Sequence, residues 1–162
     1  MPRILVVDDH RDVRAMISML LRVNHFEVIE AESVAAGLKA FEDARFDVAI
    51  VDIFLSDACG FDLITAMRER APRLAVVAVS GMAALDSVSQ SSELSDVVCL
   101  QKPFRPTDLI RAVSGAREAV SRSAGANSER PSELQGNAPG DTGAFETEAD
   151  VRCQEPFGLI SV

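Results

Sequence analysis

Five short apolar runs recur along residues 1–100, and an amphipathic segment follows each of them. The runs are nearly continuous and do not alternate with polar residues, which is typical of strands buried on both faces of a parallel sheet. They occupy residues 3–7, 26–29, 47–52, 74–79 and 96–100. Because strands and helices alternate, we predict an α/β fold of three layers, in which right-handed crossovers place helices on both faces of the sheet.

The segments between these runs carry apolar residues at helical spacing. The clearest one presents a single apolar stripe made of Val13, Met16, Ile17, Leu20 and Leu21. Ser33 can cap the second helix, the third ends before Pro72, and Pro106 opens the last. The fourth, over residues 84–92, is rich in serine and is the weakest helix of the series.

The composition changes after residue 120. Residues 121–162 are acidic, rich in Gly, Pro and Ser, and without periodicity, which predicts a disordered tail. The chain of 162 residues therefore has room for one folded domain, residues 1–120. We expect no effector domain in the tail.

Charge and composition exclude several classes of function. The net charge is −9 and no cluster of Lys and Arg is present, so we expect no direct binding of nucleic acid. No apolar stretch is long enough to span a membrane, so we expect no membrane association. The three cysteines show no CxxC spacing, which gives no support for a zinc site and favours a reducing cytoplasm as the location.

Carboxylates follow two of the apolar runs directly. Asp8 and Asp9 come after the first run, and Asp52 ends the third. The carboxyl ends of parallel strands meet at one edge of the sheet, where α/β proteins bind their ligands. Three converging carboxylates suggest a site for a hard cation, although Asp8 could instead cap the first helix. We interpret His10 as the solvated start of that helix.

These carboxylates belong to a longer pattern. Ser80 follows the fourth apolar run, and Lys102, Pro103 and Phe104 follow the fifth. In order, type and approximate spacing, the whole set resembles the receiver domains of two-component response regulators, over residues 3 to about 120. This resemblance implies a doubly wound, flavodoxin-like (βα)5 fold with five parallel strands in the order 2-1-3-4-5.

The resemblance also implies a phosphoryl-transfer site. Asp52 is expected to be the phosphoacceptor, and Lys102 and the hydroxyl of Ser80 to contact phosphoryl oxygens. It further implies a cis bond between Lys102 and Pro103, which would aim the lysine.

The same resemblance implies Mg²⁺ as the cofactor. Asp9 and Asp52 are expected to bind the ion directly, together with the backbone carbonyl of Phe54, and Asp8 through a water molecule.

Three positions depart from the family pattern or extend it. Receivers usually carry Tyr or Phe three residues before the lysine, and here that position is Cys99, whose thiol cannot replace a ring as a switch. Phe54 and Met82 flank the expected position of the phosphoryl group, and both are apolar. We therefore expect slow hydrolysis of the phosphorylated state, because neither side chain can orient an attacking water.

We predict a stand-alone phosphoreceiver that takes its phosphoryl group from a histidine kinase or a histidine phosphotransfer protein. It would catalyse only its own phosphorylation and dephosphorylation, and signal to a downstream protein through its fourth helix, fifth strand and last helix. The same surface is a candidate homodimer interface. A receiver-like module that acts without phosphorylation is the alternative. A Mg²⁺-dependent phosphohydrolase is less favoured, because it would need a second Asp where Phe54 stands.

Overall fold

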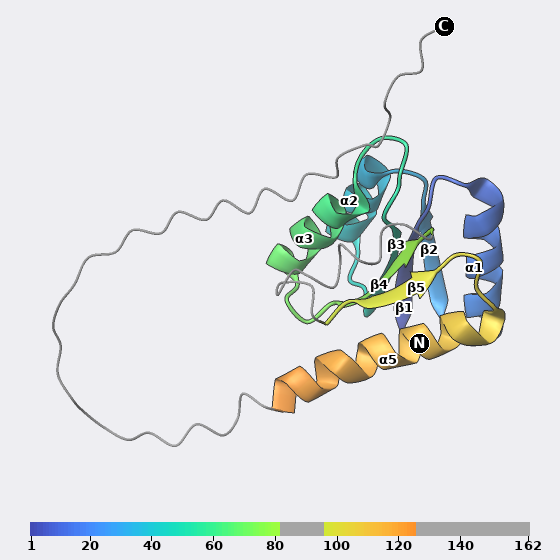
Figure 1. The fold of residues 1–162 in the computed structure, drawn as a ribbon. Coiled ribbons are helices and arrows are strands. Elements are labelled where there is room, and N and C mark those ends of the chain that lie inside the picture. Colours follow the sequence, from blue (N-terminus) through green and yellow to red (C-terminus); the bar gives the residue numbers. More distant parts are fainter. Residues whose placement is uncertain (82–95, 126–162) are drawn as a thin grey trace, which may run out of the picture. The chain divides into compact units, whose positions relative to one another are not determined.

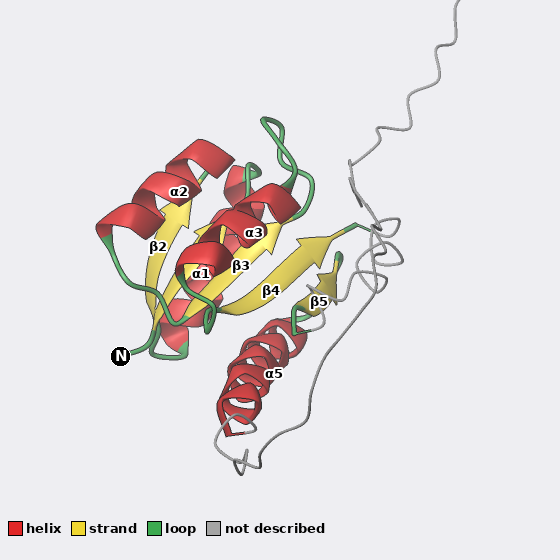
Figure 2. Cartoon of the chain, turned by 90° about the vertical axis from the view of Figure 1, so that its left-hand side faces the viewer, coloured by secondary structure: helices red, strands yellow, loops and turns green. Residues whose placement is uncertain are grey.

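A parallel sheet of five strands forms the middle layer of the computed structural model, which describes residues 1–81 and 96–125. The strand order is β2-β1-β3-β4-β5, as the resemblance implied. Figure 2 shows the strands pointing the same way, with β2 and β5 at the two edges. The strands are β1 Arg3–Val7, β2 Glu27–Ala31, β3 Val48–Asp52, β4 Ala75–Ser80 and β5 Val98–Gln101.

Among the described residues, two pairs of helices cover the two faces of the sheet (Figure 1). The helices are α1 Arg11–Val23, α2 Val34–Asp43, α3 Gly60–Arg70 and α5 Pro106–Gly125. Buried side chains of α1 and α5 share one apolar cluster, and those of α3 share the other with partly buried residues of α2. The two faces therefore have separate cores, which explains why β3 and β4 are buried at every position.

Local sequence signals set the helix ends. The hydroxyl of Ser33 accepts a hydrogen bond of 3.1 Å from the backbone N–H of Ala36, so the predicted cap of α2 is present. The stripe predicted for α1 is partly wrong, because Met16 is 44% exposed and Ser18 is fully buried instead. Ile17 and Leu21 do face the core.

Gly60 allows the start of α3 to pack directly against the end of β3. Its N–H donates a 2.9 Å hydrogen bond to the carbonyl of Ile53. A Cβ at this position would lie 2.9 Å from both the carbonyl carbon of Asp52 and the Cα of Ile53, closer than real Cβ atoms approach. The absence of a side chain here thus fixes the path of the chain just after Asp52.

Some predictions lie outside the described residues. These are the fourth helix over residues 84–92, the position of Met82, and the tail from residue 126 onward. Helix α5 itself continues to Gly125, past the boundary expected at residue 120.

Candidate functional site

Asp8 and Asp52 lie side by side at the carboxyl end of the sheet. Asp52 is the last residue of β3, and Asp8 follows the end of β1. These strands are neighbours, with Val7 paired to Val51, so their register brings the two carboxylates to one edge. Both residues are almost completely buried, with exposed fractions of 1% for Asp8 and 5% for Asp52. Two buried carboxylates this close require a compensating positive charge.

Lys102 supplies that charge. Its Nζ lies 2.7 Å from Oδ2 of Asp52 and 2.9 Å from Oδ2 of Asp8, and donates a hydrogen bond to each. The lysine follows β5, and the peptide bond between Lys102 and Pro103 is cis. Its backbone N–H donates to the carbonyl of Ser80 at 2.7 Å, which attaches this loop to the end of β4.

Asp9 is held by the loop that follows β3. The backbone N–H of Ser56 donates to Oδ2 of Asp9 at 3.1 Å. Oδ1 of Asp9 is buried, and Nδ1 of His10 lies 2.8 Å from it. A buried carboxylate oxygen needs a polar or charged partner, a role that His10 or a cation can fill.

His10 also belongs to the cluster, although its sequence position predicted only a solvated start of the first helix. Its Nδ1 lies 2.8 Å from Oδ1 of Asp9 and 3.5 Å from Oδ1 of Asp8. Its backbone N–H donates to Oδ1 of Asp8 at 2.8 Å. One side-chain atom each of Asp8, Asp9, His10 and Asp52 could ligate a metal ion, and these atoms all lie within 4.8 Å of one another. Its position directly after an Asp-Asp pair was the only signal in the sequence.

Arg14 fixes the backbone of the acidic pair. Its Nη1 donates to the carbonyl of Asp8 at 2.6 Å, and its Nε lies 3.6 Å from a carboxylate oxygen of Glu30 on β2. The guanidinium therefore ties α1 to the loop that carries Asp8 and to the neighbouring strand.

The pKa shifts in this cluster have opposing causes. Burial raises the pKa of Asp52 above its ordinary value, and the hydrogen bond and charge of Lys102 only partly offset this. Burial acts to lower the pKa of Lys102, but its bonds to Asp52 and Asp8 outweigh that effect and raise it. Burial also acts to raise the pKa of Asp9, but hydrogen bonds from Ser56 and the charge of His10 leave it lowered. Lys102 and Asp9 therefore stay charged at neutral pH.

The remaining predicted residues lie around this cluster. Ser80 is fully buried at the end of β4, and its hydroxyl donates to the carbonyl of Gly81 at 2.9 Å. Phe54 is 55% exposed, while its backbone N–H donates to Oδ1 of Asp52 at 3.0 Å. Cys99 lies on the edge strand β5 and is exposed, although partial burial raises the pKa of its thiol.

The donor set fits a hard divalent cation. Such ions prefer oxygen ligands, and the cluster brings oxygens of three carboxylates close together. The role of the Phe54 carbonyl as a further ligand stays a prediction.

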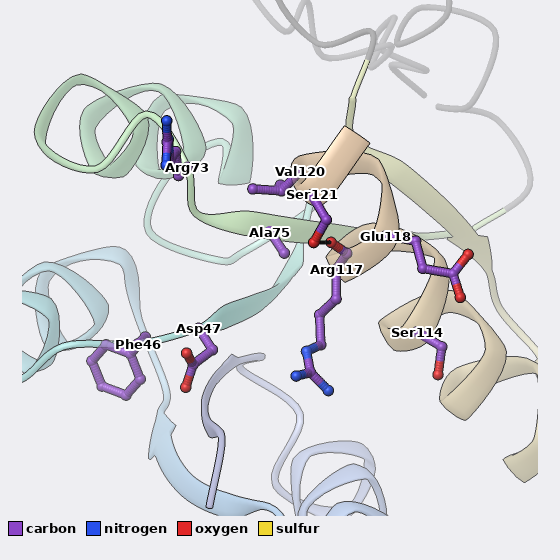
Figure 3. A pocket seen from close by; sticks show the side chains of 9 residues that line it. All are labelled: Phe46, Asp47, Arg73, Ala75, Ser114, Arg117, Glu118, Val120 and Ser121. Carbon is purple, nitrogen blue, oxygen red and sulfur yellow. Dashed lines mark hydrogen bonds between the residues drawn. The ribbon is translucent and has the colours of Figure 1, made fainter. Parts of the chain in front are cut away.

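A pocket of about 540 Å³ lies at the opposite end of the sheet (Figure 3). Its walls include Phe46 and Asp47, which precede β3, and Arg117 from α5. Because these residues lie near the amino ends of the strands, the pocket is separate from the acidic cluster.

Comparison with known proteins places this fold and site in context. Residues 4–114 match the family model described as the response regulator receiver domain. The photosynthetic apparatus regulatory protein RegA of Rhodovulum sulfidophilum is 30% identical over 120 residues, covering 74% of this chain and 65% of RegA. The transcriptional regulatory protein PrrA of Mycobacterium tuberculosis is 31% identical over 128 residues, covering 79% of this chain and 55% of PrrA. The matched region thus spans less than two thirds of either relative.

Two solved structures have the same fold. The receiver domain protein from Clostridium thermocellum has a TM-score of 0.66 at 28% identity, covering 76% of this chain and 98% of that one. The CheY-like receiver domain protein from Methanospirillum hungatei JF-1 has a TM-score of 0.69 at 27% identity, with the same coverage of 76% and 98%.

Proposed function

This chain belongs to the response regulator receiver domain family of two-component systems, and from that premise we propose that it accepts a phosphoryl group on Asp52. The donor would be a histidine kinase or a histidine phosphotransfer protein. The observation that carries the proposal is the contact of Lys102 Nζ with the carboxylates of both Asp52 and Asp8 at the carboxyl edge of the sheet.

Each side chain has a role in this transfer. An oxygen of Asp52 forms the new bond to phosphorus while the bond to the donor's histidine nitrogen breaks, and that nitrogen leaves with the electron pair and is protonated by solvent. The ammonium group of Lys102 shifts its contact from the carboxylates to a phosphoryl oxygen. The Ser80 hydroxyl turns away from the Gly81 carbonyl and donates a hydrogen bond to another phosphoryl oxygen. Nearly all of the rate enhancement would come from this positioning and charge compensation.

The family generally binds Mg²⁺ at such an acidic cluster. We propose that Asp9, Asp52 and the Phe54 carbonyl hold the ion directly and Asp8 through water. When bound, the ion supplies positive charge that offsets the repulsion between a carboxylate and an anionic phosphoryl group. Incubation with acetyl phosphate and Mg²⁺, followed by intact mass measurement, tests the proposal. A protein that gains no phosphoryl group under these conditions would contradict it.

An exposed apolar stripe on α1 supports docking of the phosphodonor there. Met16, Met19 and Val23 share one face of the helix and are 44%, 68% and 68% exposed. The helix begins beside the acidic cluster, so a partner lying along it would reach Asp52. Apolar side chains gathered on a surface often mark protein interfaces.

We predict that Met19→Asp slows phosphotransfer from a phosphorylated histidine phosphotransfer protein by about tenfold, as expected when one well-buried interface residue is lost. Phosphorylation by acetyl phosphate should not change, because the site itself is intact. Ala35→Asp, which adds the same charge at an exposed position of α2, is the matched control. Equal slowing with both donors would show that α1 does not serve docking.

We also propose that the phosphorylated state is long-lived. Phe54 presents an exposed apolar ring two residues after Asp52, where a polar side chain could orient water. Phe54→Asn should shorten the half-life of the phosphorylated protein by about tenfold, after removal of excess donor. Phe54→Leu, which stays apolar, should keep the wild-type half-life. If Phe54→Asn decays no faster, the ring serves partner recognition rather than protection of the phosphate.

For output, we propose binding of a downstream protein through β5, α5 and the fourth helix predicted from sequence, with homodimerisation through the same surface. On that surface the exposed Cys99 of β5 stands at the position where receivers usually carry an aromatic switch residue. Stand-alone action stays a prediction, since the curated relatives extend beyond the matched region. We propose a cytoplasmic location and no catalysis beyond the protein's own phosphorylation and dephosphorylation. Among the described helices, none is both long and apolar enough to span a membrane.

The alternative of a receiver-like module that acts without phosphorylation is favoured by Cys99 alone. It gives no reason for three carboxylates and a lysine to gather at one edge of the sheet, so we prefer the phosphoreceiver.

A further inference from the structure

The imidazole of His10 is turned toward the acidic pair rather than toward its own helix. His10 is the N-cap residue of α1, where a side chain would normally accept a hydrogen bond from the first turn, but its side chain makes no such bond. Its Nδ1 instead lies 2.8 Å from the buried Oδ1 of Asp9. Because the side chain is 68% exposed, other orientations are open to it.

The distances between these atoms are close to the distance between adjacent ligands of one metal ion. Ligands of a small octahedral divalent ion stand about 2.1 Å from it, so adjacent ligands are about 3 Å apart and opposite ones about 4.2 Å. Nδ1 of His10 lies 2.8 Å from Oδ1 of Asp9 and 3.5 Å from Oδ1 of Asp8. With an atom of Asp52 included, all of these atoms lie within 4.8 Å of one another. This limit is slightly above the separation of opposite ligands, so small side-chain shifts would let one ion contact Asp9, His10 and Asp52 directly, with Asp8 bound through water.

We propose that Nδ1 of His10 is a nitrogen ligand of this metal site and that it makes the site prefer imidazole-binding first-row ions over Mg²⁺. The inference rests on the proposed function, since it concerns the same metal site. Carboxylate, carbonyl and water ligands suit Mg²⁺, whereas imidazole suits Zn²⁺, Ni²⁺ and related ions, whose affinity rises along the first row. A site with oxygen ligands alone would lack this additional preference.

The competing interpretation is that His10 is only a cationic partner of Asp9. A cation beside Asp9 competes with every divalent ion, so its removal would raise the affinity for all of them. A nitrogen ligand has the opposite effect, because its removal lowers the affinity, and most strongly for the ions that favour imidazole. The two interpretations therefore predict changes of opposite sign.

The experiment is a calorimetric titration of the full chain with Co²⁺ and, separately, with Mg²⁺. His10→Gln is compared with the wild type and with His25→Asn, which replaces the chain's other histidine. His25 has a positive φ of 63°, a conformation that Asn tolerates, so this control should fold normally. We expect His10→Gln to weaken Co²⁺ binding by on the order of tenfold or more, the loss seen even when an outer-shell partner of a metal ligand is removed. Mg²⁺ binding should change much less.

Nuclear magnetic resonance of the Co²⁺ form gives a second measurement. A hyperfine-shifted imidazole signal should appear in the wild type and in His25→Asn, and be absent from His10→Gln. Unchanged Co²⁺ affinity, equal losses for both ions, tighter binding of both, or a persisting imidazole signal would each overturn the inference. If the wild type binds neither ion, the metal site of the proposed function fails as well, whereas Mg²⁺ binding without a contribution of His10 to Co²⁺ binding overturns the inference alone.

Discussion

Asp52→Asn should abolish phosphorylation by acetyl phosphate in the presence of Mg²⁺. The amide has nearly the same shape as the carboxylate, and its oxygen can still accept the hydrogen bond that the Phe54 N–H donates to Asp52 at 3.0 Å. It cannot provide the anionic oxygen that forms the bond to phosphorus. Lys102 keeps its contact with Asp8, at 2.9 Å, so the site should stay folded. Intact mass spectrometry reports the product directly.

Asp57→Asn is the matched control for this substitution. Asp57 lies on the same loop after β3, is exposed, and accepts a hydrogen bond from the N–H of Val34 at 3.0 Å, which the amide oxygen can also accept. This variant should be phosphorylated like the wild type. A mass shift that survives Asp52→Asn would show that another residue takes the phosphoryl group.

Lys102→Met should reduce the free energy of unfolding by about 3 kcal/mol when Mg²⁺ is removed with a chelator. The substitution keeps most of the apolar stem but deletes the charge between Asp8 and Asp52, whose side chains are 2% and 6% exposed. Removing one partner from a buried ion pair leaves uncompensated charge, which is the costly case. Added Mg²⁺ should stabilise the variant more than the wild type, because the ion no longer competes with an ammonium group.

The cost of Lys102→Met should depend on pH. Burial already raises the pKa of Asp52 above its ordinary value of 3.8, and loss of Lys102 removes an influence that lowers it. A carboxyl group with a raised pKa in the folded state costs stability above that pKa, and the cost disappears as the pH falls below the pKa of the unfolded chain. The deficit of the variant should therefore shrink on acidification.

Urea unfolding of wild type, Lys102→Met and Lys39→Met measures both effects. Lys39 is the chain's other lysine and is exposed on α2, so its loss should matter little. The charge-compensation argument is contradicted if Lys102→Met is as stable as the wild type in chelator, or if Mg²⁺ stabilises both proteins equally.

The fold could be predicted because buried parallel strands leave a strong signal. The runs at residues 47–52 and 74–79 have no alternation, and they correspond to the central strands β3 and β4, buried at every position. Helical spacing was less reliable on α1, where a stripe of five apolar residues could not show which part would meet the sheet. Ser18 is buried and Met16 is exposed because the sheet and α5 meet a slightly different face of the helix.

Residues of the candidate site could be predicted only where a charged side chain directly follows a strand. Asp8, Asp52 and Lys102 follow strands, so sheet topology brings them together. The contacts of His10 and of the Ser56 N–H with Asp9 depend on the conformation of loops. The spacing of apolar residues in the sequence does not predict that conformation. The sequence shows that His10 precedes a helix, but it does not show the direction of the imidazole. On sequence alone, His10 is therefore interpreted as an ordinary helix start.

The length of α5 has a practical consequence for building sensors from this protein. Helix α5 spans Pro106–Gly125, or about 30 Å at 1.5 Å per residue, and its second half lines the pocket at the amino ends of the strands. A fluorescent protein fused after Gly125 would therefore leave from the side of the sheet opposite Asp52. Such a fusion would leave the phosphorylation edge open to its donor.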